Sequence, residues 1–344
     1  MSTTILLGLL LVTLAGALEG LFSLGVTRTP KWAWENSWGL GSLIALVLVP
    51  WPLALFTVPS LGEIYGSVSG VKLLLTFLFG IGWGLGGIYW GKAIAAVGMA
   101  LGVSLLMGLI NIFGSLTPFI IFQGNKLGTG GGMALIGAIA LMVVGVVCMA
   151  RAGSIKERDV NNTPVGSGKP STPFAVGLLF CVLSGALSSL VNFSFIFGDD
   201  IAKQAARSGA PGWAAGFAIW ALVFTGNYLV NFIYALALLI KNRTFGRFRE
   251  GGASHWFWAL FMGLAWPGGI AIYGIAAYML GEYGAYVGFP MMLVISILFG
   301  NLAGAMSGEW KAASRNAISW MVGGVAVLVC ALVAMGWANN LLAN

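Results

Sequence analysis

Charged side chains are scarce in this sequence. Asp, Glu, Lys and Arg make up only 8% of its 344 residues, whereas a soluble domain carries about 25%. This composition excludes a soluble globular protein of this length, because too few charged residues are present to cover its surface. Apolar residues account for 59% of the chain and the mean hydropathy is +0.94, which indicates a protein embedded in a lipid bilayer.

Histidine and cysteine are also rare, and the common reactive motifs are missing. The one histidine is His255, and Cys148, Cys181 and Cys330 lie in apolar runs without a paired spacing, which argues against disulfides or a zinc site. The sequence has no Walker phosphate loop, no His-Glu-x-x-His pair and no Gly-x-Ser-x-Gly elbow. We therefore predict that the chain is not an enzyme and uses no metal or cofactor. An ion gradient, or the gradient of a solute, remains as the energy source.

What the sequence does contain is a series of apolar runs, each close to the 20 or so residues that cross a bilayer core. A backbone in lipid must bond within helices or a closed barrel, and no alternating ten-residue pattern supports a barrel. We expect an all-α integral membrane protein of about ten transmembrane helices. The runs are 4–26, 38–58, 72–96, 99–123, 131–150, 173–197, 212–240, 254–280, 285–306 and 317–337.

The longest polar stretch, 151–172, divides these runs into two sets of five. We expect a first five-helix unit over 1–150, a cytoplasmic linker over 151–172 and a second unit over 173–344.

The net charge of +7 reports topology rather than a nucleic-acid partner, because the basic residues lie in the loops between apolar runs. With ten helices, thirteen Lys and Arg residues fall on one side and four on the other. Cytoplasmic loops carry the excess, so both termini are expected on the outer side of the cytoplasmic membrane. The four on the sparse side are Lys72, Lys126, Lys203 and Arg207.

Two pairs of similar segments indicate an internal repeat. Residues 8–18 (GLLLVTLAGAL) return as 177–187 (GLLFCVLSGAL), a shift of 169. Because a five-helix unit has an odd number of spans, the second copy inserts upside down, as in many secondary transporters with a site between the halves. The alternative is that helices rich in Leu, Gly and Ala resemble one another by composition. A second similarity, at a shift of 183, matches Gly80, Trp83, Gly91 and Gly98 with Gly263, Trp266, Gly274 and Gly281.

Glu19 is the strongest single candidate for a functional residue. It lies about four residues past the centre of the first helix, roughly 6 Å toward the cytoplasmic side. A charged acid there costs about 2.5 kcal/mol or more, so it should face a cavity or be protonated. A carboxyl that loads and releases a proton is what a symporter needs. The alternative is a Glu19 that snorkels or bonds to a neighbouring helix; the repeat aligns it with Ser188, which confines any acid function to one half.

Deep amides and aromatic rings form a second group of candidates. In the seventh helix Trp220, Asn227, Asn231 and Tyr234 follow steps of seven, four and three, which keep one helix face. Amides bond hydroxyls and rings stack on C–H faces, so the set suits a neutral sugar; the alternative is hydrogen bonding between helices and close packing. The candidate substrate-binding residues are Asn111, Asn192, Asn227, Asn231, Trp83, Trp220, Trp266, Tyr89 and Tyr273.

Several segments resemble the L-rhamnose–proton symporter family. They are 31–35 (KWAWE), 98–102 (GMALG), 116–118 (LTP), 151–153 (RAG), 156–157 (KE) and 309–310 (EW). The resemblance covers nearly the whole chain. It implies membership of the drug/metabolite transporter superfamily, two inverted five-helix halves and uptake of a six-carbon deoxy sugar with protons. It also implies that Asn192 and Asn231 fall where that family has polar helix residues, but it supplies no acid at Glu19.

The leading hypothesis is therefore a proton-coupled transporter of a small sugar such as L-rhamnose, working by alternating access. Its partners are the sugar, protons and the lipid bilayer, with no nucleic acid and no indication of oligomeric state. A second hypothesis is uncoupled transport or export of another polar metabolite. A remote third is a membrane-embedded enzyme or sensor, which has little support beyond Glu19 and His255.

Overall fold

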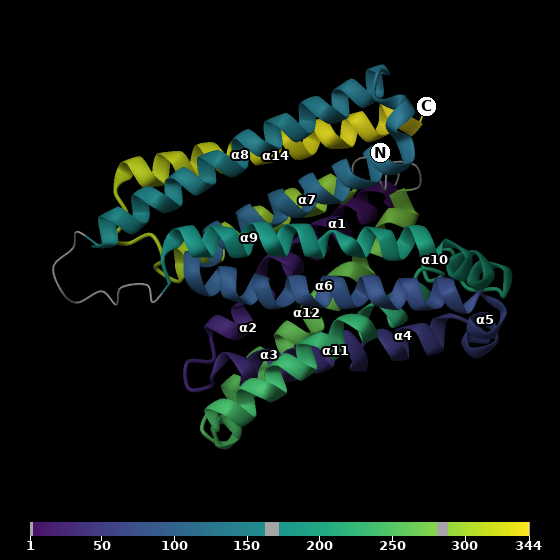
Figure 1. Ribbon diagram of the computed structural model, residues 1–344, viewed down its shortest axis with the longest axis horizontal. Coiled ribbons are helices and arrows are strands. Elements are labelled where there is room, and N and C mark those ends of the chain that lie inside the picture. Colours follow the sequence, from purple (N-terminus) through teal and green to yellow (C-terminus); the bar gives the residue numbers. More distant parts are fainter. Residues whose placement is uncertain (1–2, 162–171, 281–287, 344) are drawn as a thin grey trace.

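The computed structural model describes residues 3–161, 172–280 and 288–343, and within these ranges all regular structure is helical. The helices form an elongated bundle, and both chain termini lie at the same end of it (Figure 1). We call this the terminal end. The opposite end holds α2 and the start of α3 (Figure 1), together with Arg28 and Lys31, and we call it the basic end. Which end faces the cytoplasm stays a prediction.

Nine segments of the described chain are long and apolar enough to cross a membrane, and each matches one predicted run. The remaining run corresponds to a shorter apolar helix, α13, which the structure describes from Phe289; residues 281–287 lie outside the described part. The multi-pass, all-helical prediction is therefore confirmed. Six runs are single helices: α6 (Gly70–Val97), α7 (Met99–Gln123), α8 (Gly130–Asn161), α11 (Phe217–Asn242), α12 (Gly252–Leu280) and α14 (Arg315–Ala343). Helix α13 is Phe289–Met306.

Three spans are interrupted. The first consists of α1 (Thr3–Leu21) and α2 (Leu24–Thr27), and the sixth of α9 (Phe174–Ser188) and α10 (Leu190–Arg207). The second joins α3 (Trp34–Leu43) and α4 (Pro50–Thr57) through a π-helical stretch, η1 (Ile44–Leu48). Proline lacks an N–H and cannot continue the ladder of a preceding helix, which explains the break before Pro50.

The connecting segments hold shorter helices. Helix α5 (Leu61–Ser67) lies between α4 and α6 at the terminal end (Figure 1). Two short 3₁₀ helices, η2 (Gly124–Lys126) and η3 (Phe245–Arg249), follow α7 and α11. Helix α8 continues through Asn161, so the predicted linker range 151–172 begins inside this helix, and residues 162–171 lie outside the described part.

Helices of the two predicted units pack mainly on each other. Helix α1 packs on α12 and α13, while α9 packs on α6 and α7. Helix α6 packs on α11, and α12 packs on α3 and η1. The last helices of the units, α8 and α14, lie side by side along one flank (Figure 1). The middle of the bundle is therefore built from both units.

Glycine permits the closest of these approaches. At Gly80 of α6 a Cβ atom would lie 2.3 Å from the Val223 carbonyl oxygen of α11, and at Gly226 of α11 it would lie 2.3 Å from the Phe77 carbonyl oxygen of α6. Both distances are shorter than any real Cβ contact, so only glycine allows these two backbones to touch. The contact draws the aromatic side chains of α6 and α11 toward the same space.

The segment 31–35 is anchored at the basic end. The Glu35 carboxylate accepts hydrogen bonds from the Thr244 hydroxyl (2.7 Å) and the Asn242 amide (3.0 Å), and Asn36 donates to the Thr244 carbonyl (3.0 Å). Arg243, between them, adopts a left-handed conformation (φ 53°) that ends α11. These bonds tie the start of α3 to the end of α11.

Candidate functional site

A cavity of about 300 Å³ lies between the two predicted units. Its wall comes from the first span, from α3, α6, α7, α9, α10, α11 and α12, and from α13. Sites for small molecules begin at roughly this volume. Seven of the ten candidate residues line it: Glu19, Asn111, Asn192, Trp83, Trp220, Trp266 and Tyr273.

Glu19 is the one charged side chain in the described wall of this cavity. Only 8% of the residue is exposed, and its Oε1 atom has no hydrogen-bond partner among the described residues. A Cβ atom at Gly269 would lie 2.9 Å from that Oε1, so glycine on α12 is what allows the carboxyl group to lie there. An unpaired buried carboxylate costs several kcal/mol. The group must therefore carry a proton or receive a positive charge from whatever enters the cavity.

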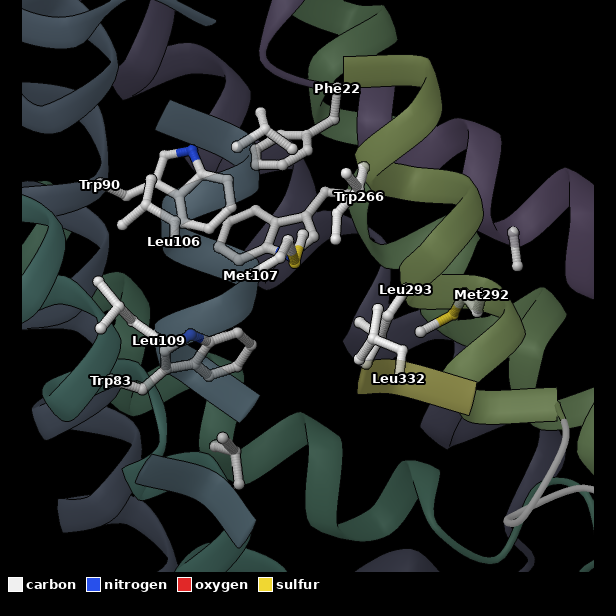
Figure 2. Close-up of a cluster of buried hydrophobic side chains, with 14 of the residues drawn as sticks. Phe22, Trp83, Trp90, Leu106, Met107, Leu109, Trp266, Met292, Leu293 and Leu332 are labelled. Atoms are coloured by element: carbon white, nitrogen blue, oxygen red, sulfur yellow. The ribbon is translucent and has the colours of Figure 1, made fainter. Parts of the chain in front are cut away.

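Aromatic rings line the cavity near Glu19, beginning with Phe22 one helical turn away. Phe22 stacks on Trp266 with ring centroids 5.5 Å apart, and its ring lies 5.8 Å from that of Trp90. Trp83 meets Trp266 edge to face at 5.6 Å. Figure 2 shows these four side chains gathered in one region, with Met107 beside them. Such offset and edge-to-face contacts are the favourable geometries for aromatic pairs.

A second aromatic group lines the cavity nearer the terminal end. Trp220 lies 4.7 Å from Phe195 and 5.9 Å from Trp83, centroid to centroid. Tyr273, on α12, contacts Phe289 of α13 at 5.7 Å. The wall therefore offers ring faces from both predicted units.

Two amides supply hydrogen-bonding capacity. Asn111 donates to the Met107 carbonyl (2.8 Å), one turn back on α7, and Asn192 donates to the Gly114 carbonyl (3.0 Å). Among the described residues neither side-chain oxygen has a partner, so both can accept hydrogen bonds from a ligand.

Three candidates lie away from the cavity. Asn231 accepts a hydrogen bond from the Trp38 indole (2.6 Å) and donates to the Asn227 side-chain oxygen (2.7 Å), and both asparagines are fully buried. Their role in the structure is to hold Trp38, which does line the cavity. Tyr89 packs against Phe180, with centroids 5.8 Å apart, outside the cavity wall.

Sequence reasoning did not choose several residues of the wall as candidates, among them Phe22, Trp38 and Ser188. Phe22 follows Glu19 by three positions and therefore shares its helix face. Ser188 could have been chosen from the sequence, because the shift of 169 aligns it with Glu19. A Cβ atom at Gly86 would lie 2.6 Å from the Ser188 hydroxyl oxygen, a contact like that of Gly269 with Glu19.

Residues 1–339 match the family model described as L-rhamnose-proton symport protein. The chain belongs to the L-rhamnose–proton symport family. Within this family, the L-rhamnose-proton symporter of Cronobacter sakazakii is 26% identical over 350 residues, covering 99% of this chain and 100% of the relative. The symporters of Yersinia pestis and Yersinia pseudotuberculosis are 25% identical and cover 98% of this chain. No solved structure matches the chain.

Membership of the L-rhamnose–proton symport family makes the chain a multi-pass membrane transporter rather than an enzyme. An identity of 25–26% carries the family but not the individual sugar. The cavity between the predicted units, with Glu19 as the one carboxyl group in its described wall, is the candidate solute site of this transporter.

Proposed function

We propose that this protein is a secondary active transporter that takes up a small sugar, such as L-rhamnose, together with protons. The observation that carries the proposal is Glu19, the one charged group in the described cavity wall, without a partner for its Oε1. Such a group gains or loses a proton as access to the cavity changes. The names of the relatives, which are proton symporters, agree with this role.

The rest of the wall suits a neutral deoxy sugar. Ring faces of Trp83, Trp220 and Trp266 can stack on its C–H groups, while Asn111 and Asn192 can accept hydrogen bonds from its hydroxyls. In the proposed cycle, protonation of Glu19 removes its charge, sugar fills the cavity, and the loaded transporter reopens toward the cytoplasm. There the proton and the sugar leave.

We also propose that the two units are inverted repeats and that alternating access exchanges their roles. Pairs of contacts support this symmetry: Glu19 lies against Gly269, and Ser188 lies against Gly86. These pairs are related by the same two shifts, 169 for the first member and 183 for the second. Inverted repeats give secondary transporters a site near the midplane between the halves.

The arrangement of whole helices supports the same symmetry. The first span packs on α12 and α13, the eighth and ninth spans, as the sixth span packs on α6 and α7, the third and fourth. The repeat-related Trp83 and Trp266 touch each other beside the cavity. The shift of 169 places the helix break at Ser189 within three positions of the break at residues 22–23 of the first unit. We place both termini on the outer face of the cytoplasmic membrane, as the distribution of Lys and Arg predicts.

Uptake of radiolabelled L-rhamnose into proteoliposomes tests the proposal. We expect an inward proton gradient to drive accumulation in the wild type, and Glu19→Gln to abolish the gradient-driven part. Glu63→Gln, the same chemical change on exposed α5, should behave as wild type. Uptake that ignores the gradient in the wild type would favour uncoupled transport. Gradient-driven uptake that survives in Glu19→Gln would remove the proton from this residue.

A further inference from the structure

The cavity combines a buried carboxyl group with aromatic faces and contains no basic side chain in its described wall. We infer that it also binds small organic cations, with an ammonium group held between Glu19 and the ring of Trp266, in competition with the proton. The inference uses the site of the proposed function but does not depend on the sugar.

The electrostatic surroundings of Glu19 favour a cation. Its own helix has no other ionisable side chain. Of the helices packed against it, α12 brings Tyr273 to the cavity, and α13 contributes no ionisable group between Phe289 and Met306. No Lys, Arg or His lines the described wall. The positive charge that an ionised Glu19 requires must therefore come from a ligand.

The rings stand where they can share that cation. Phe22 lies three positions after Glu19 on the first span, and Trp266 lies three positions before Gly269, which touches Glu19 from α12. Phe22 and Trp266, stacked at 5.5 Å, are thus one helical turn along their own helices from Glu19 and from Gly269, respectively. Cations bind ring faces within about 6 Å of the centroid, with tryptophan the best partner. An ammonium group can reach the carboxylate and a tryptophan together.

Binding then involves a defined proton balance. When Glu19 is protonated, its O–H bond breaks, the proton leaves to water and the carboxylate pairs with the ammonium group. Each cation bound releases up to one proton, so proton and cation exclude each other. This exclusion is the requirement for exchanging one for the other across a membrane.

The test compares choline with 3,3-dimethylbutan-1-ol, its uncharged carbon isostere, on the purified full-length protein in detergent. Binding is followed by tryptophan fluorescence, since Trp38, Trp83, Trp90, Trp220 and Trp266 line the cavity, and by calorimetry in buffers of different ionisation enthalpy. We expect saturable choline binding at least tenfold tighter than that of the isostere. We also expect proton release. At pH values where Glu19 is protonated, the Kd for choline should rise up to tenfold for each unit by which the pH is lowered.

Two variants locate the effect. Glu19→Gln should weaken choline binding at least tenfold and remove proton release, whereas Glu63→Gln should bind as wild type. Equal affinity for choline and its isostere, or choline binding without proton release, overturns the inference on the wild-type protein alone, whatever the variants do. Gradient-driven sugar uptake without choline binding would leave the proposed function intact. Choline binding without sugar uptake would leave this inference standing by itself.

Discussion

The contact of α6 with α11 gives a quantitative test of the packing. Gly80→Ala would place a Cβ atom 2.3 Å from the Val223 carbonyl oxygen and 3.0 Å from the Val223 Cα and carbonyl carbon. These are backbone atoms, so no rotation of a side chain can relieve the clash. Ordinary contact begins near 3.4 Å, so the two helices must separate by about 1 Å at this crossing.

A matched control isolates the cost of that separation. Gly137→Ala lies inside α8, where nothing stands within 4 Å of the new Cβ atom, and Gly268→Ala offers the same on α12. All three changes gain about 1 kcal/mol of helix propensity, which cancels in the comparison. Overpacking costs about 1–3 kcal/mol. We therefore expect Gly80→Ala to be less stable than either control by about that amount.

The assay is thermal unfolding in detergent, followed by tryptophan fluorescence and by recovery of monodisperse protein. Gly80→Ala should unfold at a lower temperature than the wild type or at the same one, and both controls at the wild-type temperature or above. Because Trp83 lies three positions after Gly80 and lines the cavity, the variant should also bind cavity ligands more weakly. If Gly80→Ala is as stable as Gly137→Ala, the close backbone contact is not a feature of the folded protein.

Three further outcomes follow from single contacts. The Ser314 backbone N–H donates to Asp159 (2.8 Å) and holds the pKa of that half-buried carboxyl group below its usual value of 3.8. The contribution of this bond to the free energy of unfolding is therefore complete above pH 3.8 and is lost as the pH falls through the lower native pKa. When unfolding is measured as a function of pH, Asp159→Asn should lack this acid-dependent loss. Trp38→Phe leaves the buried Asn231 oxygen without its donor and should lower stability by about 1–3 kcal/mol in the same thermal assay. Ser188→Ala should raise the KM for sugar uptake while leaving the dependence on the proton gradient unchanged, and a loss of coupling would contradict its placement as a wall residue.

Hydropathy alone predicted the membrane spans, because each must present about 20 apolar residues to lipid. It could not predict the partners of polar groups within them. Asn227 and Asn231 share one face of α11 with Trp220, as their spacing indicates. Trp220 lines the cavity, whereas Asn231 bonds to Trp38 and Asn227. The depth and type of a residue do not show whether it contacts the solute or holds another side chain, because tertiary packing decides which helix its face meets.

The predicted repeat pointed to a wall residue that the residues taken one by one did not. Glu19 could be chosen by its rarity, and it does line the cavity. Phe22 and Trp38 carry no comparable signal, because aromatic residues are common throughout the chain at 12%. Ser188 is found only when the two predicted units are aligned, and its contact with Gly86 is found only in the packed structure.

The partners of α1 also bear on how the protein is made. This helix packs chiefly on α12 and α13, which leave the ribosome only after most of the chain has been synthesised. Until then the first span, with its acid at Glu19, has none of its main neighbours, and an ionised acid in that position would be costly in lipid. A neutral, protonated carboxyl group lets the helix enter the bilayer and remain there until α12 and α13 are inserted. The residue proposed to carry a proton in each transport cycle thus needs one first for insertion, before any cycle begins.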